Sequence, residues 1–254
     1  MKRILIFILI FTTGLVISSC TDNSTTEPTV PDTGNLMVSS TPAGAKILID
    51  GTDSGFSTPH TFSSQDIGTY TVTLQLENYI DTSMNAVVVK DQDATVDIVL
   101  TPEYITYGPV TIWESLDPST LDPSGLSLKF GKAISISSSK DSSAYNDVYY
   151  NSDGFLVMSA KERSSNNSKM TRETYFYVGN SNSLNDKVDS PVKGSTWSKS
   201  VDANERNYIF LYDADGHYSK LLIVEKNDPS SVTSTDGNIV VKWIYNKAKD
   251  NTLF

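Results

Sequence analysis

Alternation of apolar and polar residues is the feature that most limits how this chain can fold. In one stretch Leu36, Val38 and Ser40 share a face, and in another Val72 and Leu74 do so, each separated by a polar residue. A repeat of two residues is the period of a β-strand, whereas an amphipathic helix repeats every 3.6 residues. No segment longer than two turns has helical spacing. The chain is therefore predicted to be all-β.

Residues 35–102 are predicted to form a small β-sandwich of about four to six strands. The alternating stretches are short and separated by turn residues, and Asp50-Gly51 is a strong hairpin signal between two of them. Gly44 and Gly68 are expected at bends for the same reason.

Residues 103–254 are predicted to form a larger, aromatic-rich antiparallel β-sandwich of about eight or nine strands. The strand candidates are residues 110–113, 125–130, 133–137, 147–150, 155–160, 173–178, 207–212, 220–225 and 238–245. A hairpin is expected at Gly131. The stretch 207–212 has apolar residues on both faces, which indicates a strand covered on both sides.

The first twenty residues have the three-part layout of a secretory signal. Lys2 and Arg3 precede an apolar run over residues 4–17, which is too short for a spanning helix of about 20 residues. Residues 1–19 are therefore predicted to be a signal peptide. Residues 20–34 contain one apolar side chain, Val30, and are predicted to be a flexible tether.

The end of this signal resembles the lipobox of bacterial lipoproteins, because Ile17, Ser18 and Ser19 precede Cys20. The resemblance implies cleavage before Cys20, a lipid thioether on its sulfur and a fatty acyl chain such as palmitate on the new amine. The mature protein would then be anchored in the bacterial cell envelope, at the outer membrane or cell surface. Cys20 is the single cysteine of the chain, which lipidation would explain. An ordinary signal peptide with an incidental cysteine is the alternative.

Several motifs of residues 35–102 resemble the PEGA domain. They are TPAGA at 41–45, ILIDG at 47–51 and GTYTV at 68–72. The resemblance implies a non-catalytic β-sandwich that acts as a spacer or adhesive unit in envelope proteins. Asn78 stands where that family prefers glycine before tyrosine, and asparagine tolerates the same left-handed backbone.

The last 150 residues or so resemble the HmuY-type haem-binding lipoproteins in short motifs. These are LKFGKA at 128–133, NDVYY at 146–150, YDADGHYSKL at 212–221 and VKWIYN at 241–246. The resemblance implies a shared fold and haem held between paired histidine or methionine ligands. Met170, expected on an exposed loop, and His217 are the haem-ligand candidates, whereas Met158 fits the core.

The segment Asp213-Ala214-Asp215-Gly216 is open to two interpretations. Alternate carboxylates before a glycine resemble half of a calcium loop, so Asp213 and Asp215 are cation-binding candidates. The distal glutamate of such a loop is missing. The favoured interpretation is a hairpin turn.

Charge and missing motifs restrict the function. A formal net charge of −10 disfavours nucleic acid and anionic lipid headgroups as partners. No spacing typical of a zinc site, a Cys-His couple or a nucleophile elbow is present, so no enzyme activity is expected. His60, in a loop beside Pro59, is expected to be an ordinary surface residue.

These observations predict a membrane-anchored, non-catalytic display or binding module for an envelope or extracellular ligand, a protein or a glycan. Exposed tyrosines could stack on sugars or anchor a partner. The candidates are Tyr145, Tyr149, Tyr150, Tyr175 and Tyr177. Haem capture by residues 103–254 is the alternative function.

Overall fold

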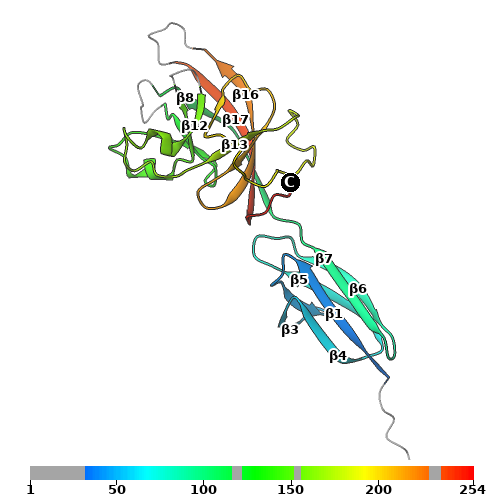
Figure 1. Ribbon diagram of the computed structural model, residues 1–254. Helices are drawn as coiled ribbons and strands as arrows, with labels where there is room; N and C mark the ends of the chain where they lie inside the picture. The colour runs from blue at the N-terminus through cyan, green and yellow to red at the C-terminus, as the bar shows by residue number, and fades with distance from the viewer. Residues whose placement is uncertain (1–31, 116–121, 152–155, 229–235) are drawn as a thin grey trace, which may run out of the picture.

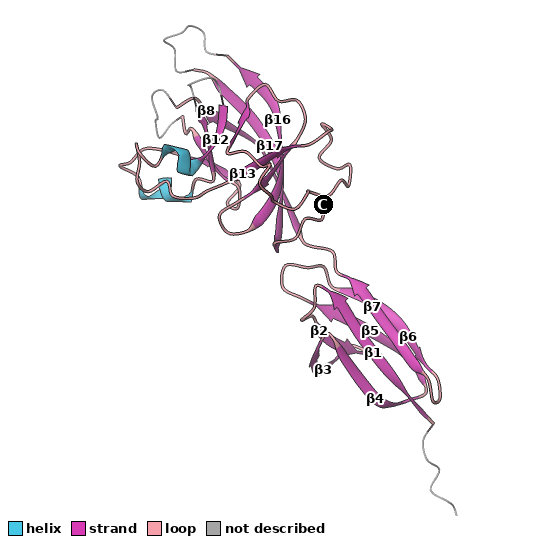
Figure 2. Ribbon diagram, in the orientation of Figure 1, coloured by secondary structure: helices cyan, strands magenta, loops and turns pink. Residues whose placement is uncertain are grey.

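The computed structural model describes residues 32–115, 122–151, 156–228 and 236–254. Its sheets form two units that lie end to end along the long axis of the molecule (Figure 1). The described secondary structure is β-strand apart from two short 3-10 turns (Figure 2). The predicted all-β fold with sandwich-like sheets is therefore confirmed. The predicted signal peptide, residues 1–19, and the predicted tether as far as residue 31, Cys20 included, lie outside the described part.

The first unit consists of two small sheets that face each other. The strands are β1 (Thr33–Thr41), β2 (Lys46–Ile49), β3 (Thr52–Ser57), β4 (His60–Asp66), β5 (Gly68–Gln75), β6 (Thr82–Val88) and β7 (Asp93–Val99). One sheet has the order β4-β1-β7 and the other β3-β2-β5-β6. The inward residues of both sheets, including Leu36, Ile47 and Leu74, form one buried core.

Local turn chemistry explains the hairpins of this unit. Asp50 and Gly51 both have positive φ angles, 49° and 78°, which fits a two-residue turn between β2 and β3. Asn78 also has a positive φ, 66°, as expected for a substitute of glycine. Gly68 has no such angle, and its φ does not require glycine.

The start of the first unit differs from the sequence prediction, which assigned residues 33 and 34 to the tether. Thr33 and Gly34 pair with Asp66 and Gln65 of β4 and begin β1. A Cβ atom added at Gly34 would collide with the carbonyl oxygens of Val89 and Gln92. The boundary was placed too late because glycine carries no apolar side chain to mark the strand.

The second unit has two five-stranded antiparallel sheets. The first contains β9 (Gly125–Ser127), β10 (Lys132–Ile134), β11 (Val148–Asn151), β12 (Leu156–Ser159) and β14 (Ser200–Asp202). The second contains β8 (Tyr104–Trp113), β13 (Tyr175–Val178), β15 (Ile209–Tyr212), β16 (His217–Asn227) and β17 (Asn238–Lys249). All nine predicted strands are present in part, and β14 is the one that the sequence did not indicate.

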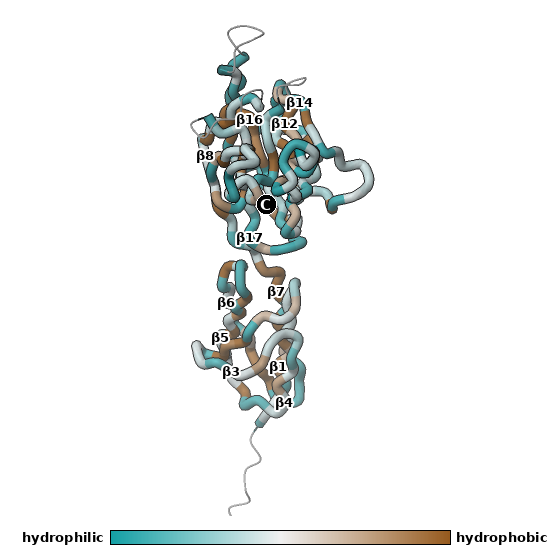
Figure 3. Tube along the Cα trace, turned by 90° about the vertical axis from the view of Figure 1, so that its left-hand side faces the viewer, coloured by the Kyte–Doolittle hydropathy of each residue, from teal (hydrophilic) through white to brown (hydrophobic). Residues whose placement is uncertain are grey.

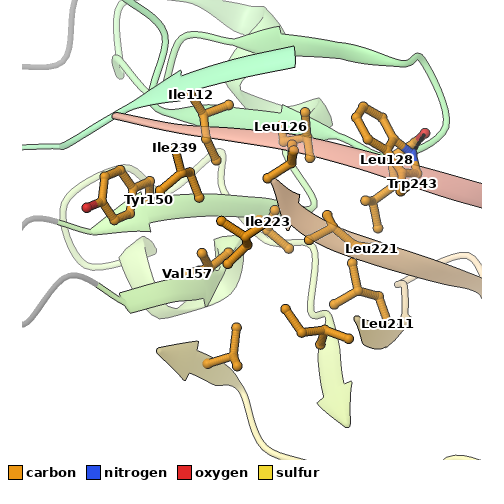
Figure 4. Close-up of a cluster of buried hydrophobic side chains, with 14 of the residues drawn as sticks. Ile112, Leu126, Leu128, Tyr150, Val157, Leu211, Leu221, Ile223, Ile239 and Trp243 are labelled. Atoms are coloured by element: carbon orange, nitrogen blue, oxygen red, sulfur yellow. Dashed lines mark hydrogen bonds between the residues drawn. The ribbon is translucent and has the colours of Figure 1, made fainter. Parts of the chain in front are cut away.

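The main core of the second unit lies between these two sheets. Leu126 and Leu128 from one sheet meet Leu221, Ile223 and other apolar residues from the other (Figure 4). Trp243 is fully buried at the end of this core and donates its Nε1–H to the carbonyl oxygen of Leu128 at 3.0 Å. The apolar segments run through the interior of each unit and polar loops surround them (Figure 3).

The outer faces of both sheets are covered as well. Tyr208 and Phe210 belong to an aromatic cluster on the face of β15 opposite Ile209 and Leu211. This confirms the expectation that the strand is buried on both sides. The buried Lys220 of β16 forms an ion pair with Asp186 and so ties the 179–199 segment to the sheet.

The chain enters β8 directly from the first unit, and its C-terminal segment returns to the junction. Glu103 and Lys247 form an ion pair, and Lys247 N donates to the Glu103 carbonyl at 2.9 Å. Asn251 donates its Nδ2–H to the Tyr79 hydroxyl at 3.1 Å. These contacts join the last strand of the second unit to the end of the first (Figure 1).

Gly34→Ala tests the revised start of the first unit. We expect a loss of more than about 1 kcal/mol in its free energy of unfolding, because the added methyl meets backbone oxygens rather than flexible side chains. The measurement is thermal and chemical unfolding followed by circular dichroism. Gly194→Ala, where a Cβ atom meets no atom closer than the Val192 oxygen at 3.9 Å, is the control. Equal stability of the two variants would indicate that residue 34 belongs to the tether and not to β1.

Candidate functional site

An open groove of about 520 Å³ lies in the second unit, beside the hairpin of β9 and β10. Its lining residues are Phe130, Lys132, Ala133, Ile134, Ser135, Lys140, Ser142 and Tyr145. We call it the β10 groove. The lining residues of the groove come from two neighbouring stretches of chain. One is the β9–β10 hairpin, and the other is the 3-10 turn η1 (Asp141–Tyr145) with the residue before it.

Two exposed aromatic rings form one wall of the β10 groove. Phe130 is 51% exposed and Tyr145 is 54% exposed, although both are large and partly apolar. Their ring centroids are 5.7 Å apart with an interplanar angle of 80°, an edge-to-face arrangement. Lys132 places its Nζ 6.0 Å from the centre of the Phe130 ring.

Three side chains from distant parts of the sequence fix the hairpin that carries Phe130. The Asp147 carboxylate accepts the Leu128 N–H at 2.8 Å, and Trp243 donates to the Leu128 carbonyl. Tyr107 donates its hydroxyl to the Lys129 carbonyl at 2.8 Å. The backbone just before Phe130 is thus held from both sides.

Gly131 allows the chain to turn tightly after Phe130. Its φ is +68°, and a Cβ atom there would collide with the ring of Tyr107. The other wall is fixed by Asn146, whose buried amide donates to the carbonyls of Ser135 and Ser143 at 3.2 and 3.1 Å. The groove is therefore a built part of the fold.

A buried charge network lies behind the hairpin. Arg172 donates its Nε–H to Asp147 at 2.7 Å and its Nη2–H to Asp215 at 2.8 Å. The Asp147 side chain is 1% exposed and that of Asp215 is 44% exposed. Asp147 therefore joins the guanidinium to the backbone of Leu128, and the network supports the groove from inside.

In the structure, both cation-binding candidates, Asp213 and Asp215, contact groups of the chain itself. Residues 213–216 form the turn between β15 and β16, in which Asp213 Oδ1 accepts the N–H groups of Asp215 and His217, both at 2.9 Å. The positive partner of Asp215 is Arg172. Within the described ranges no group of three histidine, cysteine, aspartate or glutamate side chains is arranged to hold a metal ion.

Burial has the largest effect on the pKa values of the two most buried carboxyl groups of this region, Asp147 and Asp213. It raises the pKa of Asp147 from 3.8 to about 6, against the opposing effect of the Arg172 charge. Burial also raises the pKa of Asp213. The hydrogen bond from Arg172 lowers the pKa of the more exposed Asp215. The pKa values of the two carboxylates that pair with Arg172 are thus shifted in opposite directions, upward for the buried Asp147 and downward for the more exposed Asp215.

Comparison with known families identifies the first unit. Residues 33–104 match the family model of the PEGA domain. The first unit is a PEGA domain. The match begins at the first residue of β1, so it agrees with the structural boundary rather than with the predicted one. No curated protein matches the chain. None of the helices in the part of the chain that the structure describes has the length and apolarity to cross a membrane.

The haem-ligand candidates do not fit a haem site in this structure. Met170 is 0% exposed and packs with Ile136, Tyr149 and Ala160, so the expected exposed loop position is wrong. His217 is half-buried, its Nδ1 lies 3.2 Å from the Asn246 carbonyl, and its ring lies on Tyr245. Met158 packs against the Met170 cluster, in accord with a core role.

The structure separates the tyrosine candidates and places His60. Tyr145 and Tyr177 are exposed, whereas Tyr149 and Tyr150 are buried and Tyr175 is intermediate. His60 begins β4 and stacks on Phe56 at 3.8 Å, rather than lying in a loop.

Sequence reasoning missed Phe130, Lys132 and Lys140 as site residues. A phenylalanine at a Gly-Lys turn, where a polar residue is usual, was the available signal.

Asp147→Asn tests the effect of burial on this carboxyl group. Because its pKa is raised in the folded state, the unfolded state ionises first as pH rises from 3.8 to about 6. The stability of the wild type relative to Asp147→Asn should therefore fall across this window, by at most about 3 kcal/mol, and level off above it. Urea unfolding at several pH values measures this difference.

Asp215→Asn is the matched control on the same guanidinium. The pKa of Asp215 is lowered in the folded state, so its contribution is present above 3.8 and is lost only as pH falls below that value. The difference in free energy of unfolding between the wild type and Asp215→Asn should therefore change little between pH 4 and 6. A wild-type advantage over Asp147→Asn that grows with pH would contradict the role assigned to burial.

Proposed function

We propose that this protein is a non-catalytic lipoprotein of the bacterial cell envelope that displays the β10 groove to bind an extracellular glycan. The PEGA domain would act as the spacer between a lipid anchor on Cys20 and the second unit. The ring pair of Phe130 and Tyr145 is the observation that carries this proposal. No nucleic acid is expected as a partner, because the chain is acidic.

Exposed aromatic rings in a groove favour a sugar ligand on physical grounds. The faces of pyranose rings present C–H groups, which pack against the negative face of an aromatic ring. About half of the surface of each of these two residues is exposed. The serine side chains of Ser135 and Ser142 line the same groove, and their hydroxyl groups can donate hydrogen bonds to sugar hydroxyls or accept them.

The junction contacts support the spacer role of the PEGA domain. Asn251 reaches Tyr79, and Lys247 pairs with Glu103, so both units contribute to the interface. A spacer joined in this way carries the second unit at a fixed distance instead of on a second flexible linker.

The resemblance of the second unit to HmuY-type lipoproteins supports an envelope-displayed β-sandwich. Haem capture, the alternative function, gains no support from the described residues. Met170 would have to leave a packed core to reach a haem iron, and Nδ1 of His217 is engaged by a backbone carbonyl.

The double variant Phe130→Ala/Tyr145→Ala tests glycan binding at the groove. We expect at least a tenfold loss of affinity, since each stacked ring contributes about 1 kcal/mol. A glycan microarray gives the ligand and biolayer interferometry gives the affinity. Tyr177→Ala removes another exposed tyrosine outside the groove and should bind as the wild type does. Glycan binding that survives the double variant would place the site elsewhere.

Lipidation predicts a mass change that depends on Cys20. We expect the membrane fraction of the producing bacterium to contain a chain that starts at residue 20 and carries acyl groups, because the thiol is the group that accepts the lipid. Intact-mass spectrometry measures this directly. Cys20→Ser should abolish the lipid and release the protein from the membrane. An unmodified Cys20 with residues 1–19 still attached would contradict the anchor.

A further inference from the structure

We infer that the β10 groove selects acidic glycans, those whose sugar rings carry carboxylate groups. This inference rests on the proposed function and adds the charge class of the ligand. It is carried by the two lysines of the groove, Lys132 and Lys140, and by the carboxylate-free composition of its lining.

The groove is positively charged on an acidic protein. The chain has 30 aspartate and glutamate residues against 20 lysine and arginine residues. Two of the eight lining side chains are nevertheless lysines, and none of the eight is a carboxylate.

The carboxylate nearest to Lys140 in the sequence pairs with a lysine outside the groove lining. Asp141 directly follows Lys140, yet its Oδ1 bonds Lys169 Nζ at 2.7 Å. The hydrogen bond from Lys169 lowers the pKa of Asp141. Among the ion pairs of the described residues, none involves Lys132 or Lys140. Their ammonium groups are therefore available for an anionic ligand.

The position of Lys132 relative to the rings suits a sugar acid. Its Nζ lies 6.0 Å from the centre of the exposed Phe130 ring. The ammonium group lies over the ring face, so a pyranose that packs against the Phe130 and Tyr145 pair would bring its exocyclic C5 substituent within reach of it. In a uronic acid that substituent is a carboxylate, which pairs with lysine. In a neutral hexose it is a hydroxymethyl group, which can accept a hydrogen bond but has no charge to form an ion pair.

Methyl esterification removes the negative charge of the ligand and keeps its sugar skeleton, so comparing an acid with its ester measures the effect of the charge. The probes are short oligomers of galacturonic acid, mannuronic acid and hyaluronan, each compared with its carboxyl-methylated form. The full chain in mild detergent is titrated by calorimetry at low and at physiological salt. At least one acidic oligomer should bind about tenfold tighter than its ester, and the difference should shrink with salt.

Two variants assign this preference to the groove lysines. Lys132→Ala/Lys140→Ala should remove the difference in affinity between the acid and its ester. Lys90→Ala/Lys242→Ala removes two exposed lysines elsewhere and should keep the preference. Circular dichroism checks that all variants fold.

The possible results distinguish this inference from the proposed function. Equal binding of acids and esters, lost with Phe130→Ala/Tyr145→Ala, would overturn the acidic preference and leave glycan binding intact. A preference that survives Lys132→Ala/Lys140→Ala would also overturn it. Binding of a poly-glutamate peptide but of no oligosaccharide would overturn both, since the partner would then be an acidic protein.

Discussion

The candidate site depends on how the backbone of Leu128 and Lys129 is held. Its hydrogen-bonding partners are Asp147 from the start of β11, Trp243 from β17 and Tyr107 from β8. The bonds from Asp147 and Trp243 to Leu128 are buried, and a buried polar group that loses its partner is costly. Phe130 is exposed on a turn, yet the turn itself is rigid. Such a base allows an exposed ring to keep one orientation without burying it.

Arg172 extends this support to a second layer. It bridges the buried Asp147 and the exposed Asp215, so one guanidinium links the hairpin base to the turn between β15 and β16. The turn that resembles half of a calcium loop uses its carboxylates for backbone N–H groups and for arginine. The acidic residues there make contacts within the fold.

Much of the architecture could be predicted because it follows from local patterns. The β2–β3 hairpin was predicted from Asp50-Gly51, whose backbone preference is independent of the rest of the chain. The two-sided burial of β15 was predicted from the alternation around Ile209 and Leu211. Gly34 was missed, because its requirement comes from the carbonyl oxygens of Val89 and Gln92, more than fifty residues away. The short β14 was missed because three residues carry too little periodicity.

The sequence by itself determined the all-β class, most strands and the identity of the PEGA motifs, since each depends on side chains within a few residues. Only the tertiary structure decided which polar and aromatic residues are free to act. Met170 and Tyr149 are buried, whereas Phe130 and Tyr145 stay exposed. Exposure depends on which sheet face a distant segment covers. That arrangement is fixed by long-range packing and not by spacing along the chain.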